Sequence, residues 1–205
     1  PDGGLNVSVL RAPDGERILP VFRSRTAAEA AQLPVKPGAL ADVSGSHIFR
    51  MTGFDRMDID PGGEGSLTIS GDDLITLGVW ASIADVEYAI EAPEKCEAPM
   101  VTLREFSRYL VLVDGTRDAP ELLMAPDTHG RQLVAVFTAD DAVERFVQTM
   151  AAPEGVATTM PGKELFFALR QLSIDGFVFN CCGPCATRAF AMGVIDRILT
   201  EGWAV

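Results

Sequence analysis

The sequence predicts an α/β (α+β) fold of two similar small domains in tandem, each a sheet with helices packed on it. Three observations predict this fold. The 205 residues suffice for one large domain or for two with modest cores, and 47% apolar against 22% charged residues is ordinary globular usage. The same order of strand, helix, helix, strand and turn signals occurs twice along the chain. A polar segment separates the two occurrences.

The repeat is visible in the residues themselves. Ala12–Phe22 reads APDGERILPVF and Ala125–Phe137 reads APDTHGRQLVAVF, which match with one two-residue insertion. Further along, Met57–Asp60 aligns with Phe177–Asn180, each before a glycine-containing turn. Because the matches keep their order, duplication explains them better than chance.

Four strands are predicted in the second copy. Tyr109–Val113 and Glu121–Met124 are short apolar runs that flank the turn-forming pair Asp114-Gly115, which predicts a strand pair. Gln132–Phe137 is a third predicted strand, and Gly176–Phe179 is a buried one further along.

Three helices are predicted in the second copy. Thr138–Asp141 is a capping box that opens the first, which Pro153 and Gly155 close. Gly162–Leu172 is a second amphipathic helix. The third, after Gly176–Phe179, runs through apolar residues at helical spacing: Phe190, Val194, Ile198 and Leu199.

The first copy repeats this order from Leu5 to Thr68, with a capping box at Thr26–Glu29, and continues in a helix over Asp72–Ile83. Phe22 and Phe137 each end a strand before a capped helix, so we expect both side chains to be buried.

A linker is predicted between the copies. Residues 85–100 include a polar, proline-bearing stretch, Glu91–Pro99, without periodicity. We therefore expect a domain boundary near residue 95, with domains at 1–95 and 96–205.

Both copies resemble the N-terminal domain of the SseB family. Asp14-Gly15, Leu19–Phe22 and Ile59–Gly63 carry the family pattern in the first copy. Matching residues in the second copy are Gly130, Leu133, Val136-Phe137-Thr138 and Phe179-Asn180. The family is named for a serine-sensitivity phenotype and associated by name with secretion proteins. The resemblance implies two SseB-like domains in a bacterial protein, without an enzymatic activity to carry over.

The two turns after the matching strands are the candidate interaction sites. In the second copy, Cys181–Cys185 replaces the Pro-Gly-Gly turn of the family pattern. The candidate interaction or turn residues are Asp60, Pro61, Gly62, Gly63, Asn180, Gly183 and Pro184.

Cys182-Gly183-Pro184-Cys185 matches the active-site motif of thioredoxins letter for letter, and the prediction places it between a strand and a helix. A helix N-terminus would lower the pKa of a thiol there. Cys182 would then attack and Cys185 resolve. Against this, too few residues follow for the rest of a thioredoxin fold. A Gly-Pro turn with packed cysteines is the structural alternative.

Metal and hydrolase sites have weaker support. A zinc site using the three clustered cysteines needs a fourth ligand from Cys96, His47, His129 or a carboxylate, and none is placed by the sequence. The carboxylates from Asp55 to Glu64 depart from calcium-loop spacing. Neither histidine has a nucleophile partner placed by the sequence.

Charge limits the class of partner. With 17 basic and 29 acidic residues the net charge is −12, which disfavours nucleic acid and anionic lipid as partners. No apolar run is long enough to span a bilayer. Because the sequence begins at Pro1, we expect that a native N-terminal segment has been removed. Cysteine usage predicts a reducing, cytoplasmic location.

These observations together predict a function. We expect a non-catalytic interaction module that binds another protein and needs no cofactor. The alternative is a thiol-disulfide oxidoreductase, or another thiol-based enzyme, that uses Cys182 and Cys185.

Overall fold

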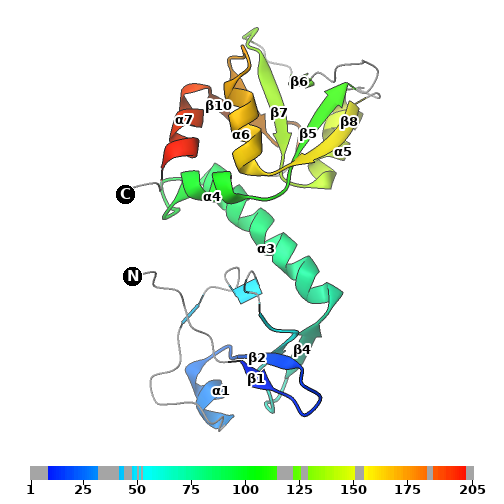
Figure 1. Ribbon diagram of the computed structural model, residues 1–205, viewed down its shortest axis with the longest axis vertical. Helices are drawn as coiled ribbons and strands as arrows, with labels where there is room; N and C mark the ends of the chain where they lie inside the picture. The colour runs from blue at the N-terminus through cyan, green and yellow to red at the C-terminus, as the bar shows by residue number, and fades with distance from the viewer. Residues whose placement is uncertain are drawn as a thin grey trace. The chain divides into compact units, whose positions relative to one another are not determined.

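The computed structural model describes residues 9–31, 42–43, 48–49, 51, 53–114, 122–125, 129–150, 155–183 and 187–201. The chain divides into two compact units, Pro1–Ser82 and Ile83–Val205, called unit 1 and unit 2 below. Each has its own sheet, of four strands in unit 1 and six in unit 2, with helices beside it (Figure 1). The predicted α/β (α+β) class is confirmed.

Unit 1 is built on a sheet of order β1-β2-β3-β4. Its central strands β2 (Arg17–Val21) and β3 (Arg56–Ile59) are parallel to each other. The edge strands are β1 (Leu10–Arg11) and β4 (Leu67–Ser70), and each is antiparallel to its neighbour. Leu19 and Met57, paired in register on the central strands, are buried.

Helix α1 (Arg25–Ala30) begins two residues earlier than predicted. The Ser24 hydroxyl accepts a hydrogen bond from the Ala27 N–H at 3.1 Å, so Ser24 and not Thr26 caps the helix. Ala28 is the buried residue of α1. Because so short a helix covers little of the sheet, Phe22 is half-buried, and the prediction that it is buried was wrong.

Helix α3 (Asp72–Glu91) extends into the region expected to be a linker and ends at the first residue of its polar stretch. Val86, Ala89 and Ile90 recur at helical spacing and are buried in the core of unit 2, which explains why the helix continues. The division between the units falls inside α3, between Ser82 and Ile83, and not near residue 95. The extents 1–95 and 96–205 for two SseB-like domains stay a prediction.

Unit 2 has the strand order β10-β9-β7-β5-β8, with the short β6 also pairing with β7. Its strands are β5 (Tyr109–Asp114), β6 (Met124–Ala125), β7 (Leu133–Phe137), β8 (Gly155–Met160), β9 (Gly176–Phe179) and β10 (Arg188–Ala191). Its further helices are α4 (Pro99–Glu105), α5 (Asp140–Met150), α6 (Gly162–Arg170) and α7 (Gly193–Thr200). Strands β7 and β9 are parallel, and the other pairs are antiparallel.

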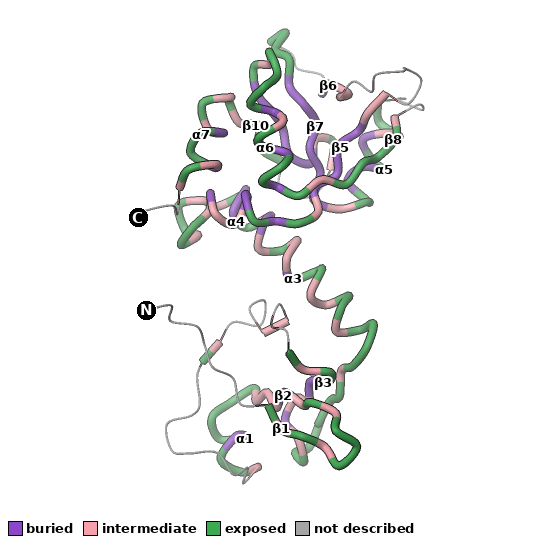
Figure 2. The backbone as a smooth tube through the Cα atoms, viewed as in Figure 1, coloured by how far each residue is buried: buried purple, intermediate pink, exposed green. Residues whose placement is uncertain are grey.

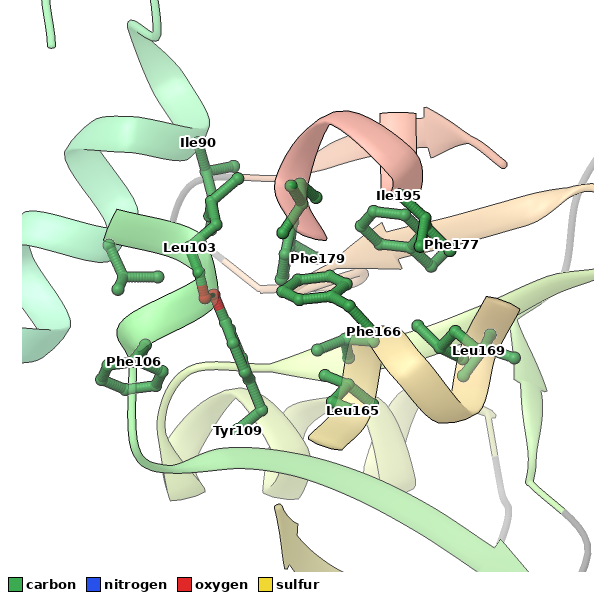
Figure 3. Close-up of a cluster of buried hydrophobic side chains, with 14 of the residues drawn as sticks. Ile90, Leu103, Phe106, Tyr109, Leu165, Phe166, Leu169, Phe177, Phe179 and Ile195 are labelled. Carbon is green, nitrogen blue, oxygen red and sulfur yellow. Dashed lines mark hydrogen bonds between the residues drawn. The ribbon is translucent and has the colours of Figure 1, made fainter. Parts of the chain in front are cut away.

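Hydrophobic residues cover both faces of this sheet. Alternate residues of β5, β7 and β9 pack on one face against α3, α4, α6 and α7, as Figure 3 shows in part. The Tyr109 hydroxyl is satisfied there by donating to the Leu103 carbonyl oxygen at 2.9 Å. The opposite face packs against α5, and it includes the buried Phe137, as predicted. The central strands are therefore buried along their length (Figure 2).

Three predictions about unit 2 were wrong. Strand β8 was not predicted, although its valine and threonines favour a strand and it pairs with β5 along its whole length. Helix α5 begins at Asp140, so Thr138 is free for other hydrogen bonds. Most importantly, β9 is followed by strand β10 and only then by α7, so Phe190 lies in a strand and not in the last helix.

Candidate functional site

The turn after β3 is held by Asp60, which is buried. Its φ of 47° is left-handed, and the Gly63 N–H donates to its carbonyl oxygen at 3.0 Å. Its Oδ1 accepts from the Arg23 N–H at 3.0 Å, and its other oxygen pairs with the Arg23 guanidinium. The backbone and side-chain hydrogen bonds from Arg23 lower the pKa of Asp60. These groups close the turn onto the end of β2.

The turn after β9 repeats this arrangement with an amide. Asn180 is fully buried with φ 46°, and the Gly183 N–H donates to its carbonyl oxygen at 3.0 Å. Its Oδ1 accepts from the Thr138 N–H at 3.0 Å. Its Nδ2 donates to the Thr138 hydroxyl at 3.0 Å, and that hydroxyl donates to Glu87 of α3 at 2.9 Å. Pro184 lies outside the described residues.

The N-terminal ends of the paired strands repeat as well. In unit 1, the Arg17 N–H donates to an Asp55 carboxylate oxygen at 2.9 Å. In unit 2, the Gln132 N–H donates to an Asp175 carboxylate oxygen at 2.7 Å. The strand registers match too, with Val21 opposite Ile59 and their aligned residues in unit 2 also opposite each other.

The side chains of Asp60 and Asn180 thus form hydrogen bonds within their own units. Gly62 and Gly63 are exposed and Pro61 is half-buried. Gly62 has a φ of 78°, which a residue with a side chain adopts only at a cost. Asp60 and Asn180, the first residues of the two turns, therefore hold the turns in place. An interaction role for the exposed residues stays a prediction.

Cys181 and Cys182 lie in the turn between two strands and not before a helix. Cys182 and Gly183 belong to the turn between β9 and β10, and Cys185 lies outside the described residues. Burial raises the pKa of Cys181 to about 12, with the neighbouring Cys182 as a second cause. Because a strand follows the turn, the helix-dipole reason for an activated thiol does not apply.

We expect a maleimide at neutral pH to label Cys182, which is exposed, and to leave Cys181 largely unlabelled in the folded protein. Mass spectrometry of the variants Cys181→Ser and Cys182→Ser separates the two signals. Faster labelling in Cys182→Ser than in Cys181→Ser would contradict the burial of Cys181.

The other candidate ligands do not gather. Asp55 pairs with Arg17, and Asp58 with Arg56. His129 is exposed and His47 is outside the described residues. In the part of the chain that the structure describes, no three His, Cys, Asp or Glu side chains are grouped to hold a metal. No described helix is both long and apolar enough to span a membrane.

A groove of about 430 Å³ in unit 2 was not foreseen from the sequence. One side is the segment between α3 and α4 with the start of α4, and the others are β10 and α7. The lining residues are Pro93, Glu94, Pro99, Met100, Arg188–Ala191, Val194 and Arg197. The volume is in the range of ligand clefts, about 300–1,000 Å³. The sequence does not predict this groove, because the residues of β10 have the spacing of the last helix.

Strand β10 presents an open edge in this groove. The Met192 N–H donates to the Asp175 carbonyl oxygen at 3.3 Å, so these two form a hydrogen-bonded pair of the antiparallel ladder. Along an antiparallel ladder, hydrogen-bonded residue pairs alternate with pairs whose main-chain groups point away from the partner strand. Phe190 therefore also turns its main-chain groups toward β9, whereas Ala189 and Ala191 turn theirs away. Within the described residues, no strand pairs with this outer edge.

Residues 1–75 match the family model of the SseB protein N-terminal domain. The match supports the SseB family for the N-terminal part of the chain, and it lies within unit 1. Neither a curated protein nor a solved structure matches the chain.

Proposed function

We propose that the chain is a non-catalytic interaction module whose unit 2 binds an extended segment of another protein along the outer edge of β10. The observation that carries this proposal is the groove, which borders a strand edge that pairs with no strand of the described residues. A strand edge offers a row of main-chain donors and acceptors, and peptides are commonly bound by adding a strand to it.

The local structure supports this mode of binding. The Phe190 carbonyl oxygen stands 2.1 Å from where a Cβ at Gly176 would lie, so it is turned toward β9. A glycine there lets β9 and β10 approach closely. The outward groups of Ala189 and Ala191 then belong to exposed residues with small side chains, which leave room for a second backbone.

We also propose that the chain contains two tandem SseB-like copies. The support is the equivalent hydrogen bonding of Asp60 and Asn180, at aligned positions with the same left-handed backbone. In this proposal unit 2 adds β5 and β8 to the shared arrangement. The bound partner belongs to the second copy, because the groove lies wholly in unit 2.

Replacing Ala189 with Pro tests the binding mode. Proline removes the outward N–H of residue 189 and keeps the hydrogen bonds between β10 and β9, and edge strands tolerate it. We expect linear peptides, selected from a random phage-displayed library on the full chain, to bind Ala189→Pro at least about tenfold more weakly. Fluorescence anisotropy measures the loss.

Ala189→Ser is the matched control, because it keeps the N–H at an exposed position. Ala191→Pro is a second variant with the same logic, and circular dichroism reports whether each variant folds. Unchanged affinity in both folded proline variants would overturn strand addition at β10.

Changing Cys182 and Cys185 to Ser together is expected to leave binding intact.

A further inference from the structure

The groove contains an arginine side chain with which no carboxylate of the described residues forms an ion pair. Arg188, the first residue of β10, forms no ion pair with any residue that the structure describes. Arg197, the other arginine of the groove, pairs with Glu201 at 2.7 Å. Glu94 is the acidic residue in the lining. The lining therefore holds two arginines and one carboxylate in a chain whose net charge is −12.

The Arg188 guanidinium is held in place by neutral groups. Its Nη1 donates to the Ile90 carbonyl oxygen at 3.1 Å, at the end of α3. Its central carbon lies 5.4 Å from the centre of the Phe190 ring. Phe190 is itself stacked on Phe177, with ring centroids 5.5 Å apart. A guanidinium has five N–H donors in a planar fork, so further donors remain for a ligand.

We infer that Arg188 recognises an Asp or Glu side chain of the extended segment that pairs with β10. This inference rests on the proposed function of the groove. Neighbouring strands lie about 4.8 Å apart, and alternate side chains share a face. A residue paired beside Arg188 therefore places its side chain on the face of Arg188 and Phe190, within reach of the guanidinium.

The same register predicts a second recognised residue in the segment. Two positions from the acidic residue, the next side chain on this face lies beside Phe190, near Met100 and Val194 in the groove lining. These are apolar groups, so we expect an apolar side chain there. The ligand is then an extended peptide with an acidic and an apolar residue two positions apart.

The peptides selected on the full chain test this inference. We expect them to be enriched in this pattern, and replacing their acidic residue with its amide to weaken binding about tenfold. The same replacement should have no effect on binding to Arg188→Gln, while Arg188→Lys should restore part of the loss. Arg145→Gln, an exposed arginine on α5, is the matched control.

The outcomes separate the inference from the function. Peptides without acidic enrichment that still lose affinity in Ala189→Pro would overturn the role of Arg188 and leave strand addition standing. Acidic peptides that bind Ala189→Pro and wild type equally would overturn strand addition. Loss of peptide binding when the peptide C-terminus is amidated would show that the contact is the terminal carboxylate, and the inferred ligand would be wrong. It would also be wrong if the chain self-associates and Ala189→Pro prevents the self-association.

Discussion

Replacing Phe137 with Ala is expected to lower the free energy of unfolding of unit 2 by about 3–5 kcal/mol. The side chain is fully buried in the core between the sheet and α5, with its ring 5.3 Å from that of Phe146. Truncation removes this burial and leaves a cavity that neighbouring strands cannot easily fill. Urea unfolding followed by circular dichroism measures the change.

The aligned Phe22 is the natural comparison. It is half-buried beside a helix of six residues, so Phe22→Ala is expected to cost clearly less than Phe137→Ala. A near-neutral Phe137→Ala variant would show that the core of unit 2 is misplaced. Equal costs at the two positions would contradict the difference in their burial.

Replacing Asn180 with Ala is expected to destabilise unit 2 by about 2–4 kcal/mol. The change leaves the Thr138 N–H without its acceptor in a buried site. It also places alanine at φ 46°, without the side-chain hydrogen bonds that stabilise asparagine in this left-handed conformation. Thermal and urea unfolding measure the cost.

Asn180→Gly separates the two contributions. Glycine accepts the left-handed backbone, so what this variant loses reports the side-chain hydrogen bonds alone. We expect a cost between those of wild type and Asn180→Ala. Asn180→Asp is also expected to destabilise, because no described arginine occupies the place that Arg23 takes beside Asp60. Tolerance of all three changes would contradict the structural role of Asn180.

The sequence was informative where one residue decides a local structure. Glycine and asparagine or aspartate after an apolar strand predicted both turns, because few residues adopt a left-handed backbone. The apolar character of Gln132–Phe137 and Gly176–Phe179 predicted β7 and β9. The spacing of Leu165, Phe166 and Leu169 predicted α6.

The sequence misled where several structures share one pattern. Phe190, Val194 and Ile198 recur every four residues, which is typical of a helix, yet Phe190 faces the core from a strand and the other two from α7. The periodicity came from two elements that cover the same face. This error placed the cysteine motif before a helix and hid the open edge of β10.

The groove could not be predicted for a related reason. Its walls come from the segment after α3 and from β10 and α7, which are distant in the sequence and meet only in the fold. The polar, proline-bearing stretch around Pro93 and Pro99 is typical of a linker, although it borders the groove. Arg188 alone carries no signal, because its lack of an ion pair is a property of the packed structure.

Hydrogen exchange at single residues of β10, measured by NMR with and without a selected peptide, tests the central claim most directly. The amides of Ala189 and Ala191 face away from β9, and the amide of Phe190 is already bonded to it. We predict that saturating peptide slows exchange at Ala189 and Ala191 by at least about tenfold and leaves Phe190 little changed. Bound peptide with unchanged exchange at Ala189 and Ala191 would contradict strand addition at β10.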